Sequence, residues 1–64
     1  LGDEHLHYRL VRTEGPDHDR KYTIALYYHG VRLGEATGSS KKEAEQGAAS
    51  IAWHSREDWV PVLS

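Results

Sequence analysis

The chain has 64 residues, no cysteine and a formal net charge of −2. A chain of this length forms one small domain, which buries only about 60% of the surface that the unfolded chain exposes. The composition excludes disulfides and thiolate metal sites. Because no apolar run has membrane-spanning length and no signal peptide is visible, we expect a cytoplasmic protein without a membrane partner.

The first predicted strand covers residues 8–14. Its side chains alternate between two faces, and one face carries Tyr8, Leu10 and Arg12. Residues 1–7 show no clear period and are left unassigned. We therefore place the start of a sheet at Tyr8.

A hairpin is predicted after a polar connection. Residues 15–19 contain glycine, proline and aspartate and form the connection, while residues 21–29 have the strongest strand pattern. A tight turn at His29-Gly30 then leads into a third strand over residues 31–37. One face of the second strand is formed by Tyr22, Ile24, Leu26 and Tyr28. One face of the third strand is formed by Val31, Leu33 and Glu35.

A helix is predicted over residues 40–56. Ser40 provides the N-cap, and Glu43 three residues later completes a capping box. Gly47 costs about 1 kcal/mol relative to alanine and marks a close approach of the helix to the sheet. The inner face consists mainly of small side chains, namely Ala44, Ala48, Ile51, Ala52 and Ser55.

The order of these elements predicts the fold class. Three strands followed by a helix give an α+β domain over residues 1–64, with a three-stranded antiparallel sheet and the helix on one of its faces. The tail, residues 59–63, is too apolar to remain in solvent, and Pro61 is expected to exclude a helix through it.

The first two helical positions carry the wrong charge for their place. A helix start prefers Asp or Glu, so Lys41 and Lys42 each cost about 0.3–1 kcal/mol there. Residues 29–42 hold three basic and one acidic side chain, a balance of +2, whereas residues 43–58 hold one basic and four acidic, a balance of −3. A bound anion would offset the cost, because free N–H groups and two ammonium groups meet at this point. The alternative is a pair of solvated surface lysines.

Two separated motifs resemble the double-stranded-RNA-binding domain. The first is Gly-Pro-Asp-His at residues 15–18, between Tyr8 and the aromatic Tyr22. The second is Gly34-x-x-x-Gly38-x-Ser40-Lys41-Lys42-x-Ala44-Glu45-Gln46-x-Ala48-Ala49. The match covers residues 8–53 and is most similar to the C-terminal domain of bacterial ribonuclease III.

The sequence departs from this family in three places. The family fold begins with a helix before the strands, and the seven residues before Tyr8 are too few for it, so either the chain is a truncated piece or this member lacks the helix. Ala36 stands where a glycine is usual, and Glu45 stands where many members have a third basic residue. Because the missing helix leaves sheet and helix surface uncovered, we expect the segment from Trp59 to Leu63 to fold back over part of it.

The resemblance implies a domain that recognises A-form RNA by its shape, over about 16 bp, at two minor grooves and the major-groove phosphates between them. The helix start is expected to bind those phosphates through Ser39, Ser40, Lys41 and Lys42. The loop is expected to enter a minor groove through Gly15, Pro16, Asp17 and His18. There the His18 side chain and the Pro16 carbonyl would lie near a ribose 2′-hydroxyl.

Other functions are weighed against this one. The net charge of −2 and Glu45 favour a protein-interaction or dimerisation module with weak or no RNA binding. A metal site on His5 and His7 lacks a further ligand at zinc-like spacing. A stacking platform of Tyr and Trp for single strands lacks interleaved basic residues. We expect no cofactor, no metal and no catalytic residue, in a module of a larger protein such as ribonuclease III.

Overall fold

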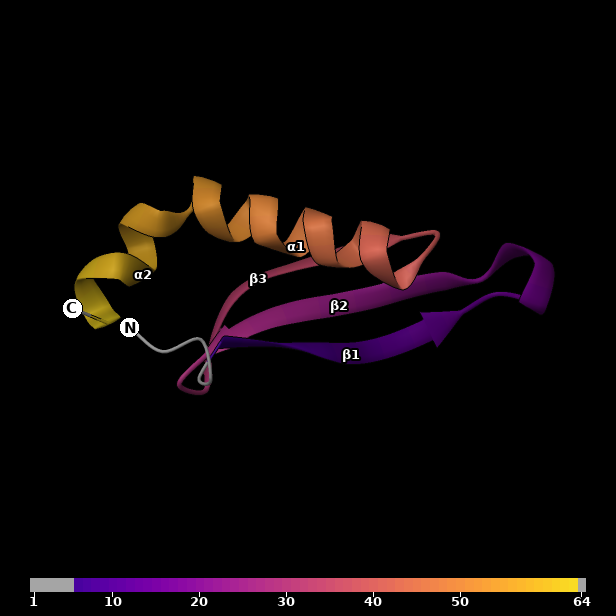
Figure 1. Ribbon diagram of the computed structural model, residues 1–64, viewed down its shortest axis with the longest axis horizontal. Coiled ribbons are helices and arrows are strands. Elements are labelled where there is room, and N and C mark those ends of the chain that lie inside the picture. The colour runs from indigo at the N-terminus through magenta and orange to yellow at the C-terminus, as the bar shows by residue number, and fades with distance from the viewer. Residues whose placement is uncertain (1–5, 64) are drawn as a thin grey trace.

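The computed structural model describes residues 6–63, and its elements follow the predicted order (Figure 1). Three strands are followed by two helices: β1 (Leu6–Glu14), β2 (Lys21–Tyr28), β3 (Val31–Gly38), α1 (Lys41–His54) and α2 (Arg56–Leu63). A short 3₁₀ turn, η2 (Asp17–Asp19), lies between β1 and β2. The α+β class is therefore confirmed. Most of the unassigned segment, residues 1–5, lies outside the described residues.

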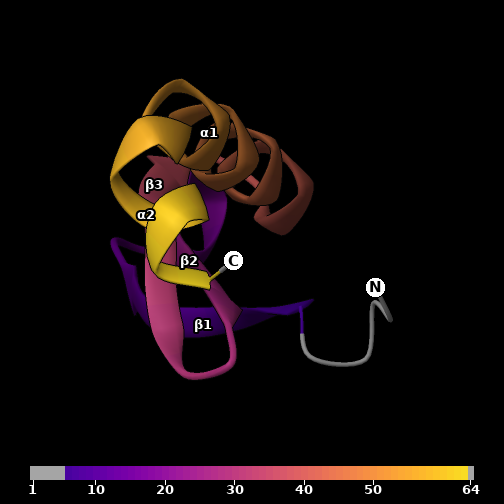
Figure 2. The same ribbon diagram turned by 90° about the vertical axis from the view of Figure 1, so that its left-hand side faces the viewer.

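The sheet is antiparallel with the strand order β1-β2-β3, and α1 lies across one of its faces (Figures 1 and 2). The helix packs on β3 and β2, and β1 is left without a covering helix among the described elements. The predicted turn is confirmed: His29 and Gly30 both have positive φ, 52° and 79°, as a two-residue hairpin requires. The buried core is small and consists of Thr23, Ile24, Ala25, Leu26, Leu33, Ala44, Ala48 and Ala52.

The helix lies close to the sheet because small residues line the contact. A Cβ added to Gly34 would lie 2.5 Å from the carbonyl oxygen of Ala48 and 2.8 Å from the backbone nitrogen of Ala52. A Cβ added to Gly47 would lie 2.8 Å from the Cβ of Ala36. The predicted close approach at Gly47 is confirmed, and at Gly34 the backbones of β3 and α1 are almost in contact.

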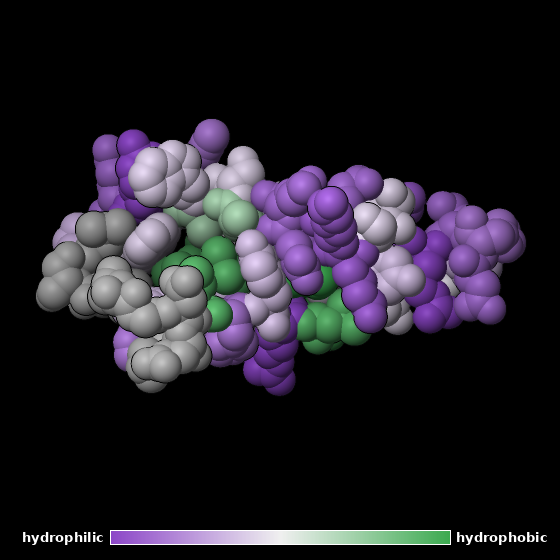
Figure 3. Space-filling view, viewed as in Figure 1, coloured by the Kyte–Doolittle hydropathy of each residue, from purple (hydrophilic) through white to green (hydrophobic). Residues whose placement is uncertain are grey.

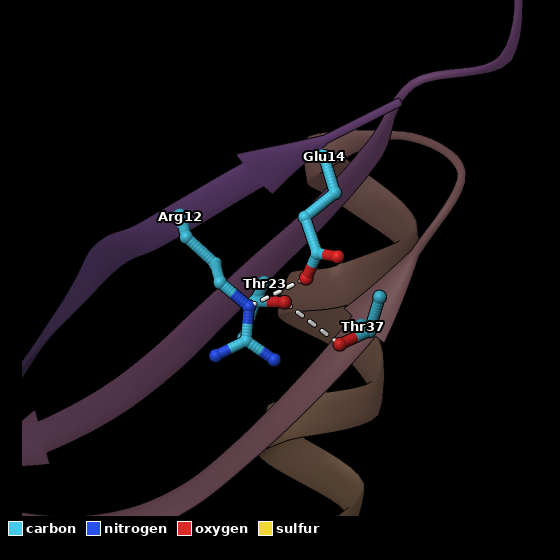
Figure 4. A network of polar contacts seen from close by, with 4 residues as sticks. All are labelled: Arg12, Glu14, Thr23 and Thr37. Atoms are coloured by element: carbon cyan, nitrogen blue, oxygen red, sulfur yellow. Dashed lines mark hydrogen bonds and ion pairs between the residues drawn. The ribbon is translucent and has the colours of Figure 1, made fainter. Parts of the chain in front are cut away.

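One irregularity in β1 corrects its predicted alternation. Leu10 pairs with Ile24, but after a register shift Arg12 pairs with Thr23. Neighbouring residues of a strand point to opposite faces, so Arg12 does not share a face with Leu10. It lies with Glu14 on the open face of the sheet, away from α1 (Figure 4).

A second irregularity corrects β3. Tyr27 pairs with Arg32 and Leu26 with Gly34, so Leu33 is an extra residue in β3. Leu33 still packs into the core with Leu26. Beyond it the alternation is shifted by one, and the prediction that Glu35 shares the face of Leu33 is wrong.

The helical end of the chain differs from the prediction in two further ways. The inner face of α1 is buried at Ala44, Ala48 and Ala52, but Ile51 is 47% exposed. Ala49, which is half-buried, packs on the core instead. The face of α1 that contacts the sheet is therefore rotated away from Ile51. The helix does not run to residue 56 either, because Ser55 caps it and α2 begins at the next residue.

The prediction that Pro61 excludes a helix is wrong, because Pro61 lies inside α2. Proline lacks a backbone N–H and therefore removes one helical hydrogen bond. Because α2 has only 8 residues, few other hydrogen bonds lie beyond the turn that contains Pro61. The predicted return of the tail is confirmed at Trp59. This residue packs on the core, and its Nε1–H donates to the carbonyl oxygen of Ala52 at 2.7 Å.

We expect Trp59→Ala to lower the free energy of unfolding by about 1–3 kcal/mol, because it removes a half-buried aromatic side chain and its hydrogen bond. Trp53→Ala is the matched control, since it removes the same type of side chain at a position that is 61% exposed. Thermal unfolding of both variants measures the difference. Equal melting temperatures for Trp59→Ala and the parent chain would show that the tail does not cover the core.

Candidate nucleic-acid interface

The start of α1 is fixed by its cap. The backbone N–H of Glu43 donates to the hydroxyl oxygen of Ser40 at 3.1 Å, and the first helical hydrogen bond runs from Ala44 to the Ser40 carbonyl at 3.0 Å. The predicted N-cap is confirmed. The N–H groups of Lys41 and Lys42 therefore have no acceptor within the helix and point out of its first turn.

The carboxylate of Glu43 completes this turn in a different way from the predicted capping box. It accepts a hydrogen bond from the hydroxyl of Ser39 at 2.8 Å. Ser39 and Ser40 are thus both fixed by Glu43, one through its side chain and one through its backbone. These two hydrogen bonds tie the segment between β3 and α1 to the first turn of the helix.

Lys41 and Lys42 are exposed, and neither has an ion-pair partner among residues 6–63. Of the other six lysines and arginines, four have a carboxylate within ion-pair distance, namely Arg12, Arg20, Lys21 and Arg32. Arg9, in β1, and Arg56, in α2, have none among the described residues, but neither lies at a helix start beside a second cation. Two uncompensated cations therefore lie at the electropositive end of a helix. The arrangement can bind an anion through ammonium groups and backbone N–H groups together.

The loop between β1 and β2 is a tight turn that depends on Gly15. Its φ is +88°, and a Cβ there would lie 2.5 Å from the carbonyl oxygen of Asp19. The backbone N–H of Asp19 donates to the carbonyl of Pro16 at 2.9 Å. One lone pair of that carbonyl is therefore used within the loop, and the other can accept a hydrogen bond from a ligand.

The side chains of the loop are exposed, but they are not all free to bind a ligand. His18 is exposed at the tip, in η2. The carboxylate of Asp17, by contrast, accepts a hydrogen bond from the Arg20 guanidinium at 2.7 Å. Sequence reasoning did not single out Arg20, although its spacing of three residues from Asp17 is one at which ion pairs form in helical turns.

Strand register brings the loop and the helix start to one end of the molecule. Glu14 pairs with Lys21 at the end of the β1–β2 hairpin, and Tyr22 pairs with Gly38, the last residue of β3. Both segments leave the sheet at this end (Figure 1). The molecular surface there is mainly hydrophilic (Figure 3). The eight predicted contact residues thus share one end of the fold.

The alternative sites find less support. Within residues 6–63, no three His, Asp or Glu side chains are grouped so that they could hold a metal ion. His7 stacks on Tyr27 with ring centroids 5.6 Å apart, and His5 lies outside the described residues. The aromatic residues do not form one platform, because Tyr28 and Trp59 pack on the core while Tyr27 lies on the opposite face of the sheet. No helix within the described part of the chain is long and apolar enough to span a bilayer.

Comparison with known proteins shows which family and which relatives the chain is similar to. Residues 3–55 match the family model described as double-stranded RNA binding motif. The chain is 49% identical over 51 residues to Ribonuclease 3 of Pelotomaculum thermopropionicum, 55% over 42 residues to that of Geobacter metallireducens, and 54% over 46 residues to that of Streptomyces coelicolor. These matches cover 80%, 66% and 72% of this chain, but only 21%, 17% and 17% of the relatives. The chain therefore spans about a fifth of the length of the relatives that it matches.

Proposed function

The chain belongs to the double-stranded RNA binding motif family and binds double-stranded RNA, and we propose that it does so with the end of the molecule that carries the β1–β2 loop and the start of α1. The observation that carries this assignment is the pair of exposed lysines at the free N–H groups of α1, Lys41 and Lys42, which have no counter-ion within residues 6–63. In A-form RNA the phosphates that border the major groove come close together, so the neighbouring ammonium groups of Lys41 and Lys42 can bind them at the same time.

In this proposal the two segments have different tasks. The helix start binds phosphates through Lys41, Lys42, the Ser40 hydroxyl and the free backbone N–H groups, whereas the Ser39 hydroxyl already donates to Glu43 and holds the turn. The loop enters an adjacent minor groove, where His18 and the free lone pair of the Pro16 carbonyl meet ribose 2′-hydroxyls. Because the 2′-hydroxyl distinguishes RNA from DNA, the loop supplies the preference for RNA over DNA. The helix start supplies most of the affinity, because it binds phosphates.

We further propose that the chain serves as the non-catalytic RNA-binding module of a larger protein in the cytoplasm. The support is that relatives named Ribonuclease 3 are about five times as long as the segment they share with it. The catalytic carboxylates of such a protein would lie in another domain. The absence of cysteine suits a reducing compartment.

A second candidate function, docking of a protein or of another copy, is favoured by one observation. The uncovered strand β1 exposes large apolar side chains by 42–46%, namely Leu6, Tyr8, Leu10 and Val11. Edge strands with apolar side chains commonly pair with other chains. Sedimentation of the protein without RNA, at concentrations used for RNA titration, separates a dimer from a monomeric RNA-binding domain.

The direct test is a titration of the chain with one sequence as duplex RNA, as duplex DNA and as single-stranded RNA. We expect the tightest binding to duplex RNA at every salt concentration. Affinity should fall linearly with salt on logarithmic axes, since cationic groups displace counterions. Equal affinity for the two duplexes would contradict the assignment of the loop to a ribose-reading contact.

We expect Gly15→Ala to weaken duplex RNA binding by roughly tenfold, because a Cβ would collide with the Asp19 carbonyl and a positive φ is strained in alanine. The loop would change shape while the sheet and α1 stay folded. Gly30→Ala is the matched control. Gly30 also has positive φ, +79°, but has no atom within 4 Å of an added Cβ and lies in the other hairpin. It should lose stability without losing RNA affinity, and equal losses of affinity in both variants would contradict the role of the loop.

We expect Glu45→Lys to strengthen duplex RNA binding roughly three- to tenfold and to steepen the salt dependence by about 0.7–0.9. Residue 45 follows Lys41 by one helical turn, so the new ammonium group would lie next to Lys41 on the same face of α1. Glu57→Lys, in α2, makes the same change of charge at the other end of the molecule. A similar gain from both variants would mean that total charge, and not position, sets the affinity.

A further inference from the structure

We propose that Arg20 is a positioning residue for RNA binding, which holds and neutralises Asp17 so that an acidic loop can approach phosphates. This inference rests on the proposed function of the β1–β2 loop. It assigns Asp17 an internal task rather than a contact with RNA.

The geometry of the pair supports this assignment. An Nη of Arg20 donates to a carboxylate oxygen of Asp17 at 2.7 Å, which is the distance of a charge-assisted hydrogen bond. The bond spans the 3₁₀ turn η2, next to the backbone hydrogen bond from Asp19 to Pro16. Arg20 thus ties the end of the turn to its beginning, and His18 lies between the two tied residues.

The charge of the loop makes such a partner necessary. Within residues 15–21, two acidic side chains, Asp17 and Asp19, lie in a segment expected to enter a groove between phosphate strands. The Asp17 side chain is 96% exposed, so no other group covers its charge. Lys21 lies 3.5 Å from Asp19 and compensates the second carboxylate. Without Arg20, the loop would present an uncompensated negative charge to the RNA.

Arg20 is also poorly placed to bind a phosphate itself. Its side chain is 39% exposed, and its Nε is buried with no hydrogen-bond partner among the residues that the structure describes. The guanidinium is therefore held against the loop with one Nη engaged by Asp17. A ligand for the phosphate backbone would instead be extended into solvent, as Lys41 and Lys42 are.

The test is a double-mutant cycle of Arg20→Ala and Asp17→Asn, with affinity for duplex RNA measured over a range of salt concentrations. We expect Arg20→Ala to weaken binding by roughly five- to tenfold at low salt and by less at high salt, because salt screens the repulsion between the exposed Asp17 carboxylate and the phosphates. Asp17→Asn in the same chain should restore the affinity to within about twofold of the parent, because the charge that needed compensation is gone. Arg32→Ala is the control, since Arg32 has an equivalent pair with Glu35 in another hairpin. It should leave affinity unchanged.

Two results would overturn the proposal. If the chain with both Arg20→Ala and Asp17→Asn still binds duplex RNA weakly, and its salt slope is flatter than that of the parent chain by about 0.7–0.9, Arg20 itself binds a phosphate. If Arg20→Ala binds as the parent does, the pair has no role. Thermal melts check that the variants fold, and Arg20→Gln replaces Arg20→Ala if the shorter side chain unfolds the loop. Failure of the proposed function is separate, because the parent chain would then show no preference for duplex RNA.

Discussion

Replacing Lys41 and Lys42 together by alanine is expected to weaken duplex RNA binding by about 100-fold, because two charge-assisted contacts of roughly 1.5 kcal/mol each are lost. The slope of log affinity against log salt should flatten by about 1.4–1.8, since two phosphates are no longer neutralised. The measurement is a titration of duplex RNA at several salt concentrations.

The same double substitution is expected to leave the domain as stable as before or slightly more stable. Each lysine lies at the positive end of the α1 dipole, and no carboxylate in the described part of the chain pairs with it, so its removal relieves about 0.3–1 kcal/mol of unfavourable free energy. Loss of affinity with a gain of stability is the signature of a residue kept for its ligand.

The matched control is the pair Arg32→Ala and Arg56→Ala. It also removes two positive charges, but at the opposite end of the molecule. There Arg32 pairs with Glu35, and the Arg56 guanidinium lies 4.2 Å from the ring centroid of Trp53. This variant should keep its RNA affinity and lose some stability. A loss of folding on replacing the lysines, or equal RNA affinities of the two double variants, would contradict the assignment of the site.

Local signals in the sequence were sufficient for the three strands, for α1 and for one half of the site, but not for α2. The Ser40 cap depends on residues within one helical turn, and the His29-Gly30 turn depends on two residues that accept positive φ. The position of the lysines at the start of α1 follows directly from the cap. These features were predictable because each is determined by neighbours in the chain.

Features that depend on packing between elements were not predictable in this way. The extra residue in β3 gives no signal in the amino-acid types of the strand, yet it moves Glu35 to the other face of the sheet. The rotation of α1 that exposes Ile51 is determined by where β3 allows the helix backbone to approach. The Arg20–Asp17 pair was missed because an ion pair requires the turn η2 to be known first.

Replacing Gly34 by alanine is expected to lower the free energy of unfolding by about 3 kcal/mol or more, which lowers the melting temperature by roughly 10–20 °C. The added methyl group would lie 2.5 Å from the Ala48 carbonyl oxygen and 2.8 Å from the Ala52 nitrogen. Both are backbone atoms of α1, so no rotamer change removes the collision. The helix would have to move away from β3 and open the contact that buries the core.

Gly47→Ala provides the contrast that identifies the cause. Its added methyl group would meet only the Cβ of Ala36, at 2.8 Å, which is a side-chain atom that substitution can remove. We therefore expect Gly47→Ala to destabilise the domain, and Ala36→Gly in the same chain to restore most of the loss. Alanine also favours a helix interior over glycine by about 1 kcal/mol, which adds to the rescue. Because the obstacle at Gly34 is the backbone of α1 itself, Ala36→Gly should not rescue Gly34→Ala. If thermal unfolding found both alanine variants equally rescued, or neither destabilised, the close contact between the backbones of β3 and α1 would not be what holds the helix on the sheet.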